Sequence, residues 1–230
     1  MSIAEALNDV RARLSAAALA AGRDPASVKL IAVSKLQPAA AVREAYAEGQ
    51  RDFGENYVQE LVQKAEELRD LPLLRWHLIG HLQRNKARLV VPLVSMVHTV
   101  DTAELALELS KRFASVADGR LPVLVEVSIA GEEQKHGVAP GDLAELLDRI
   151  EALPSLALAG LMCVPPFTED PNAARPFFDE LARLRQLQGG PRRLPELSMG
   201  MTHDLEQAVG AGATCVRIGT AIFGARAPKS

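Results

Sequence analysis

The sequence predicts a closed (β/α)8 barrel of the TIM type, built as one domain over residues 1–230 with an extra helix at the N-terminus. Eight runs of strand length, most of them apolar, alternate with helical segments, and strict alternation implies parallel strands because each crossover needs a helix. Residues 156–164 are apolar throughout and residues 121–127 are apolar except for Glu126, as expected of strands buried on both faces. An open doubly wound sheet is the alternative, but no G-x-G-x-x-G follows the first strand, so its main positive sign is missing.

The individual elements follow from hydrophobic periodicity and from Gly and Pro breaks. Apolar residues at helical spacing predict a first helix over 3–21, which Gly22 ends. Strands are expected at 28–35, 51–56, 74–80, 96–101, 121–128, 156–163, 196–200 and 214–219. Helices are expected at 38–47, 58–68, 83–91, 102–115, 140–153, 171–187 and 203–211. The polar loop 129–138 is long enough to suggest that it lines a site.

Composition narrows the class of protein. The net charge of −3 gives no general footprint for nucleic acid or an anionic membrane, so neither is an expected partner. The N-terminus has no secretory signal and no apolar stretch is long enough to span a bilayer, which predicts a cytoplasmic protein. Cys163 and Cys215 lie in apolar runs and are expected to be reduced core residues. The five histidines show no tight ligand spacing, so no metal site is expected.

One lysine is placed unusually. The apolar run 28–35 ends in Lys35, and Pro38 then turns the chain. A lysine at the end of a buried strand is either solvated at its tip or held out of water for chemistry. A desolvated lysine loses its charge readily, which suits it to forming a Schiff base.

Other polar residues are expected at the same opening, because the strands of a barrel end together where active sites form. These strand-end residues are Lys35, Asn56, His77, Asp101, Ser128, Ser198, Thr202, Arg217 and Thr220. The turns around Gly200 and Gly219 follow the seventh and eighth strands, where barrels commonly hold phosphate. Alternatively, both glycines serve only tight turns. Arg217 is expected to pair with a carboxylate such as Glu126 or to face a ligand, and His77 to line the site or to be a satisfied core histidine.

Five runs in this order resemble the pyridoxal phosphate homeostasis protein family. They are Ala32-Val-Ser-Lys35, Phe53-Gly-Glu-Asn-Tyr57, His77-Leu-Ile-Gly-His-Leu-Gln-Arg-Asn-Lys86, Leu197-Ser-Met-Gly-Met201 and Val216-Arg-Ile-Gly-Thr-Ala-Ile-Phe-Gly224. The resemblance covers essentially the whole chain. It implies the barrel of the alanine racemase N-terminal domain, without that enzyme's second domain.

The resemblance also implies a cofactor and roles for individual residues. Lys35 would hold pyridoxal 5′-phosphate (PLP) as a Schiff base, and Arg217 would face the pyridine nitrogen. Asn56 and His77 would line the ring. The remaining cofactor-binding residues, at the phosphate end, would be Ser198, Met199, Thr202, Gly219 and Thr220. The family usually has Ser at the position of Thr202, which keeps the hydroxyl.

Three functions are compatible with these residues. The first is a monomeric PLP carrier that buffers the cofactor and delivers it to apo-enzymes without turnover. The second is a PLP-dependent amino-acid racemase or decarboxylase, for which neither Tyr46 nor Tyr57 is obviously placed as a second base. The third is a sugar-phosphate enzyme with Lys35 as an aldolase-like amine. The missing second domain favours the carrier, since it leaves the cofactor open to water.

Overall fold

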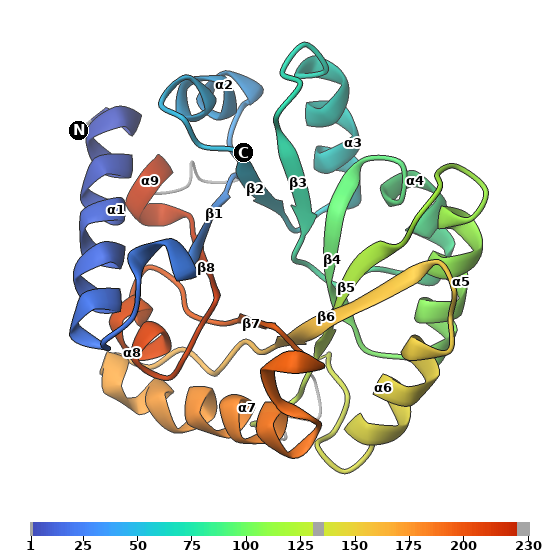
Figure 1. Ribbon diagram of the computed structural model, residues 1–230. Helices are drawn as coiled ribbons and strands as arrows, with labels where there is room; N and C mark the ends of the chain where they lie inside the picture. The colour runs from blue at the N-terminus through green and yellow to red at the C-terminus, as the bar shows by residue number, and fades with distance from the viewer. Residues whose placement is uncertain (1, 131–135, 225–230) are drawn as a thin grey trace.

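The chain forms a closed barrel of eight parallel strands, as the sequence predicts (Figure 1). The computed structural model describes residues 2–130 and 136–224. Each strand pairs with its neighbours in chain order, and β8 closes the barrel against β1. The strands are β1 (Lys29–Val33), β2 (Asp52–Glu55), β3 (Arg75–Leu78), β4 (Val94–Val100), β5 (Leu121–Glu126), β6 (Leu156–Met162), β7 (Glu196–Ser198) and β8 (Cys215–Ile218).

Helices surround the barrel on its outside (Figure 1). They are α1 (Ile3–Ala20), α2 (Ala39–Ala47), α3 (Val58–Glu67), α4 (Ala87–Val90), α5 (Ala103–Phe113), α6 (Leu143–Glu151), α7 (Arg175–Leu187), α8 (Leu205–Gly210) and α9 (Thr220–Phe223). The additional helix α1 begins with a capping box between Ser2 and Glu5. It packs against α8 and the short α9, so it covers the side of the barrel where β8 meets β1.

The main hydrophobic core lies between the strands and the helices. It includes fully buried Phe53, Leu61, Phe178 and Leu181, and burial of each such side chain stabilises the fold by about 1.5–3 kcal/mol. A second, small apolar cluster joins Met96, Leu124 and Met162. Elsewhere the strands bury Asp52, His77, His98, Ser198 and Arg217. Polar side chains therefore fill part of the volume that hydrophobic residues fill in other barrels.

The elements differ from the sequence prediction mainly at their ends. The predicted strands 74–80 and 196–200 end at Leu78 and Ser198, because the chain leaves the sheet at Ile79 and Met199. The predicted helix 83–91 is a 3-10 turn (Arg84–Lys86) followed by α4. Both cysteines are buried and unpaired, as predicted. Of the polar loop 129–138, residues 131–135 lie outside the described part of the chain.

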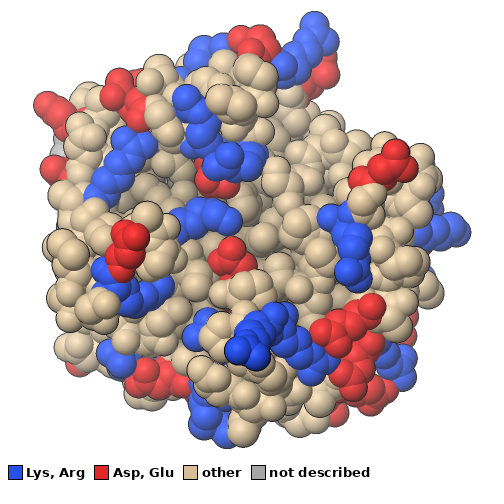
Figure 2. Space-filling view, viewed as in Figure 1, with Lys and Arg blue, Asp and Glu red and all other residues tan. Residues whose placement is uncertain are grey.

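Charges of both signs are mixed on the surface. Figure 2 shows Lys and Arg side chains beside Asp and Glu side chains over the face that it displays. Many are local ion pairs, such as Arg43 with Asp70 and Arg149 with Glu145. Exposed pairs of this kind contribute little to stability. In the part of the chain that the structure describes, every helix is too short or too polar to cross a bilayer.

Candidate cofactor site

A cavity of about 390 Å³ lies at the ends of the first, second, seventh and eighth strands. Six of the nine predicted cofactor-binding residues line this cavity: Lys35, Asn56, Thr202, Arg217, Gly219 and Thr220. The apolar part of its wall comes from Val33, Ile79, Val164, Phe167 and Phe223. The described lining includes the cationic residues Lys35 and Arg217 and no acidic residue. Such a wall suits an anion attached to a flat apolar ring.

The backbone on both sides of Lys35 is held by buried charges. Lys64, which is 5% exposed, donates to the carbonyl of Ser34 at 2.6 Å and to Glu55 Oε1 at 2.6 Å. Its third partner is Glu60, whose Oε2 accepts from Leu36 N–H at 2.7 Å. The direction in which Lys35 leaves the strand is therefore fixed by its two neighbours.

The backbone of Leu36 adds to this constraint. Its φ is +62°, and among the described residues it is the one non-glycine residue with a positive φ. A left-handed conformation costs a branched residue about 1–2 kcal/mol, so the surroundings must hold it. The hydrogen bond to Glu60 does so. Strain of this kind, next to the lysine at the cavity, is typical of functional sites.

Asn56 reaches the cavity from the end of β2. Its Oδ1 is buried without a hydrogen-bond partner in the described structure. The chain is packed closely here, since a Cβ on Gly80 would lie 2.3 Å from the carbonyl oxygen of Asn56. Gly80 is therefore required for this approach of two strand ends. A buried acceptor without a partner costs about 1–3 kcal/mol, which a ligand donor at this place would recover.

Arg217 is buried at the base of the cavity and is held by two acceptors. Its Nη1 donates to Ser198 Oγ at 2.7 Å, and its Nη2 donates to the carbonyl of Cys163 at 2.9 Å. Burial lowers the pKa of Arg217, while the nearby Cys163 and Glu126 oppose that change. An arginine titrates so far above neutral pH that it stays charged here. Ser198 and the Cys163 carbonyl thus fix the position of this cation at the base of the cavity.

Behind Arg217, a chain of hydrogen bonds runs through the inside of the barrel. Ser198 Oγ lies 3.0 Å from His98 Nδ1, and His98 Nε2 lies 2.9 Å from His77 Nδ1. His77 Nε2 lies 2.9 Å from Asp52 Oδ1. We call Asp52, His77, His98, Ser198 and Arg217 the buried histidine chain. It links β2, β3 and β4 to β7 and β8.

The aspartate determines the direction of every bond in this chain. Burial raises the pKa of Asp52, but hydrogen bonds from Arg75 and His77 outweigh it and lower that pKa, so the carboxylate is charged and only accepts. Burial lowers the pKa of both histidines, so each ring is neutral and has one N–H. His77 must therefore donate to Asp52, His98 to His77, and Ser198 to His98. The hydroxyl hydrogen of Ser198 consequently points away from the cavity.

The other three predicted cofactor-binding residues lie away from the cavity wall. His77 is 2% exposed inside the barrel, because β3 ends one residue beyond it and turns its side chain toward the interior. This placement corresponds to the alternative interpretation of His77 as a satisfied core histidine. Ser198 supports Arg217 from below, and Met199 is fully buried in the main core. Of the residues predicted to bind the phosphate, Thr202, Gly219 and Thr220 thus line the cavity.

The loop that bears Thr202 is tied to other parts of the fold. Arg13 of α1 donates to the Thr202 carbonyl at 3.2 Å and forms an ion pair with Glu206. Met201 N–H donates to Asp204 Oδ1 at 2.6 Å. Gly200 has a φ of +91°, and a Cβ there would lie 2.4 Å from the Cβ of Ala208. The tight turn that the sequence places at Gly200 is therefore required by geometry.

Comparison with known proteins agrees with this architecture. Residues 6–227 match the family described as "Alanine racemase, N-terminal domain". A relative named "Pyridoxal phosphate homeostasis protein" from Pseudomonas aeruginosa is 50% identical over 226 residues, which are 98% of this chain and 96% of the relative. A protein of the same name from Aquifex aeolicus is 44% identical over 228 residues, which are 98% of this chain and 99% of that one.

A solved structure extends the likeness to three dimensions. PipY from Synechococcus elongatus with PLP bound has a TM-score of 0.82 and 41% sequence identity, covering 97% of this chain and 100% of that one. The same protein without PLP has a TM-score of 0.85. With half of its residues identical to a relative of similar length, the chain belongs to the pyridoxal phosphate homeostasis protein family.

Proposed function

We propose that this chain binds PLP in the 390 Å³ cavity and serves in intracellular PLP homeostasis by binding, buffering and delivering the cofactor. The observation that supports this most directly is the chemistry of the wall, which joins two cationic side chains and two threonines to apolar side chains. PLP combines a phosphate dianion with a flat pyridine ring. The PLP-bound structure of the relative PipY has the same fold.

In this proposal each lining residue has one task. The aldehyde of bound PLP supplies an electrophile that forms a Schiff base with an amine, and Lys35 is the amine that we assign. Thr202, Thr220 and the backbone at Gly219 hold the phosphate. Asn56 accepts a hydrogen bond at the ring, which its unpartnered Oδ1 allows.

Arg217 is assigned to the ring nitrogen. A fixed guanidinium disfavours a second positive charge beside it, so it keeps a facing pyridine nitrogen unprotonated. Ser198 and the Cys163 carbonyl hold the guanidinium in place. His77 acts through the buried histidine chain, and Met199 is fully buried in the main hydrophobic core. A ring without a protonated nitrogen is a weak electron sink, which suits a carrier better than an enzyme of broad carbanion chemistry.

The positions of the two tyrosines support a carrier without turnover over a racemase. Tyr46 lies in α2, where the Arg51 guanidinium stacks 4.0 Å from its ring centre. Tyr57 precedes α3 and is 47% exposed. Neither belongs to the described wall of the cavity, where a second base would have to be. We further propose that the protein acts as a cytoplasmic monomer that passes PLP to apo-enzymes.

The test is a visible absorption spectrum of the purified protein with PLP, followed by borohydride reduction and peptide mass mapping. We expect a pyridoxyl adduct on Lys35 and its loss in Lys35→Ala. Lys29→Ala is the matched control, because Lys29 starts the same strand and pairs with Glu196. A colourless protein, or an adduct spread equally over surface lysines, would rule out the proposed site. Steady conversion of L-alanine to D-alanine by the loaded protein would favour the racemase.

A further inference from the structure

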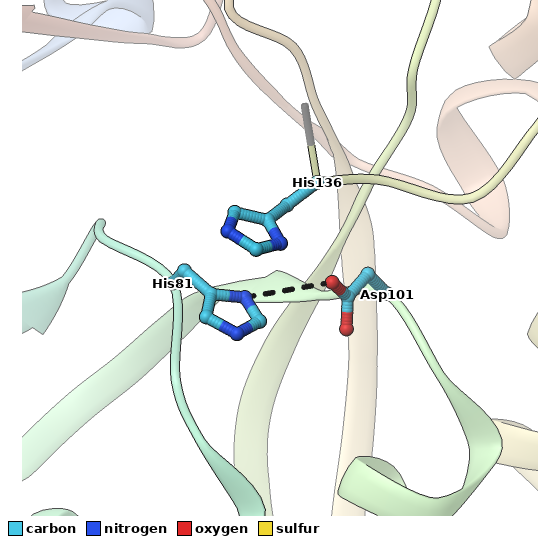
Figure 3. A group of neighbouring side chains, drawn as sticks. All are labelled: His81, Asp101 and His136. Carbon is cyan, nitrogen blue, oxygen red and sulfur yellow. Dashed lines mark ion pairs between the residues drawn. The ribbon is translucent and has the colours of Figure 1, made fainter. Parts of the chain in front are cut away.

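Three polar side chains meet at the same end of the barrel, on the side away from Lys35. Asp101 directly follows β4, His81 follows β3, and His136 belongs to the segment after β5. Figure 3 shows the three side chains pointing toward one another from these separate loops. The sequence predicted no metal site, since the five histidines show no tight ligand spacing. His81, Asp101 and His136 are 20 and 35 positions apart along the chain. The fold brings together what linear spacing does not show.

We propose that His81, Asp101 and His136 bind a divalent transition metal ion of the zinc and cobalt class. One ligand atom from each of the three residues can be chosen so that all lie within 4.8 Å of one another. Two imidazoles and one carboxylate are a donor set that such ions prefer. This inference does not depend on PLP binding.

The distances leave room for an ion. His81 Nδ1 and Asp101 Oδ2 are 3.6 Å apart, which is too long for a hydrogen bond. Two ligands at about 2.0–2.1 Å from a tetrahedral zinc ion are about 3.3 Å apart, so this pair needs little movement. The rings of His81 and His136 are stacked, with centres 3.5 Å apart and planes 8° from parallel. A turn of the exposed His136 ring out of the stack would aim a nitrogen at the same point.

The backbone holds the third ligand near the other two. Val138 N–H donates to the Glu126 carbonyl at 2.8 Å, and Ser128 N–H donates to the Val138 carbonyl at 2.9 Å. These bonds attach the chain two residues after His136 to the end of β5. Gly137 between them has a φ of +118°, and a Cβ there would lie 2.8 Å from Ser128 N. His136 is therefore presented by an anchored turn.

The electrostatic surroundings favour a cation. Two acidic groups, Asp101 and Glu126, lie close enough to interact, since Asp101 adds to the effect of burial in raising the pKa of Glu126 to about 7. Arg217 acts on Glu126 in the opposite direction. Asp101 is the carboxylate ligand of the proposed site.

The site opens onto a second cavity of about 260 Å³, which both histidines line. This cavity also borders Glu126, Thr99 and Ser128, and it shares Asn56 and other wall residues with the first cavity. Three protein ligands leave at least one coordination position for water or for a donor of a small molecule. That position would face the same opening as the proposed PLP site.

Calorimetric titration of the tag-free full-length protein with Zn²⁺, and visible spectra with Co²⁺, test the proposal. We expect one ion per chain and at least a 10-fold loss of affinity in His81→Ala, Asp101→Asn and His136→Ala. His203→Ala is the matched control, because His203 is an exposed histidine at the same end of the barrel and contacts Glu169. The proposal would be overturned if the unmodified protein bound no ion, or if the His81→Ala and His136→Ala variants bound the ion as tightly as the unmodified protein. Circular dichroism of each variant confirms that it folds.

Discussion

The buried histidine chain and the His81–Asp101–His136 cluster each combine two histidines with one aspartate, yet their environments are opposite. In the buried chain, neighbouring groups are 2.7–3.0 Å apart and each ring nitrogen has a partner. In the cluster, His81 Nδ1 and Asp101 Oδ2 are 3.6 Å apart, and both rings are exposed and lie face to face. The same residue types therefore form a saturated network in one place and an unsaturated one in the other.

This difference separates support from binding. Groups inside the barrel cannot exchange their partners for water, so a buried network must be complete to be stable. Groups at the opening can bind water, an ion or a small molecule in turn. We therefore expect the buried chain to contribute to stability and to fix Arg217, and the cluster to contribute to ligand binding with little effect on stability.

The largest difference is expected when one histidine of the buried histidine chain and one of the His81–Asp101–His136 cluster are each replaced by leucine. His98→Leu leaves His77 Nδ1 and Ser198 Oγ without their partner, and we expect a loss of about 2–4 kcal/mol in the free energy of unfolding. His81→Leu at the surface should change it by no more than about 0.5 kcal/mol. Urea unfolding at pH 7.5 measures both. Equal losses in the two variants would contradict the distinction.

The pH dependence of the same variants sharpens the comparison. The pKa values of His77 and His98 lie below the ordinary value of 6.5 in the folded chain, so the unfolded chain binds more protons in acid. Their contribution to stability is complete above pH 6.5 and is lost as the pH falls, by up to about 1.4 kcal/mol per pH unit for each ring. The destabilisation by His98→Leu should therefore shrink between pH 7.5 and 5.5. A constant difference would show that the pKa of His98 is the same in the folded and the unfolded chain.

The smallest expected effect concerns Glu126, whose pKa is raised to about 7 by burial and by Asp101. Asp101→Asn should lower this pKa, which NMR of carboxyl-labelled glutamate can follow. Asp52→Asn, at the aspartate of the buried chain, is the control and should leave it unchanged. Because the folded pKa exceeds the ordinary 4.5, the stability that protonated Glu126 contributes is lost as the pH rises from about 4.5 to 7, and Asp101→Asn should narrow that window.

Much of the fold and part of the site could be predicted from the sequence. Alternating strands and helices identify the barrel, and their position at the end of a predicted strand identifies Lys35 and Asn56. Lys64 could have been recognised as buried, since it shares a helix face with Leu61 and Leu68 at three- and four-residue spacing.

The rest could not be predicted because it depends on contacts across the barrel. His98 of β4 meets Ser198 of β7, one hundred positions later, and strand alternation alone does not say which inward side chains meet. The placement of His77 at the opening differs from the structure for a related reason: the exact end of a strand, here Leu78, is set by pairing with its neighbours. The meeting of His81, Asp101 and His136 likewise depends on three loops at once.

The single direction of the bonds in the buried chain has an electrostatic consequence. Because every hydrogen atom points toward Asp52, the bond dipoles add instead of cancelling, with their positive end at the aspartate and their negative end at Arg217. The network therefore stabilises the buried Asp52 carboxylate at one end and the buried Arg217 guanidinium at the other. An anion entering the first cavity meets the positive charge that the network holds at its base, and salt in the solvent screens that buried charge weakly.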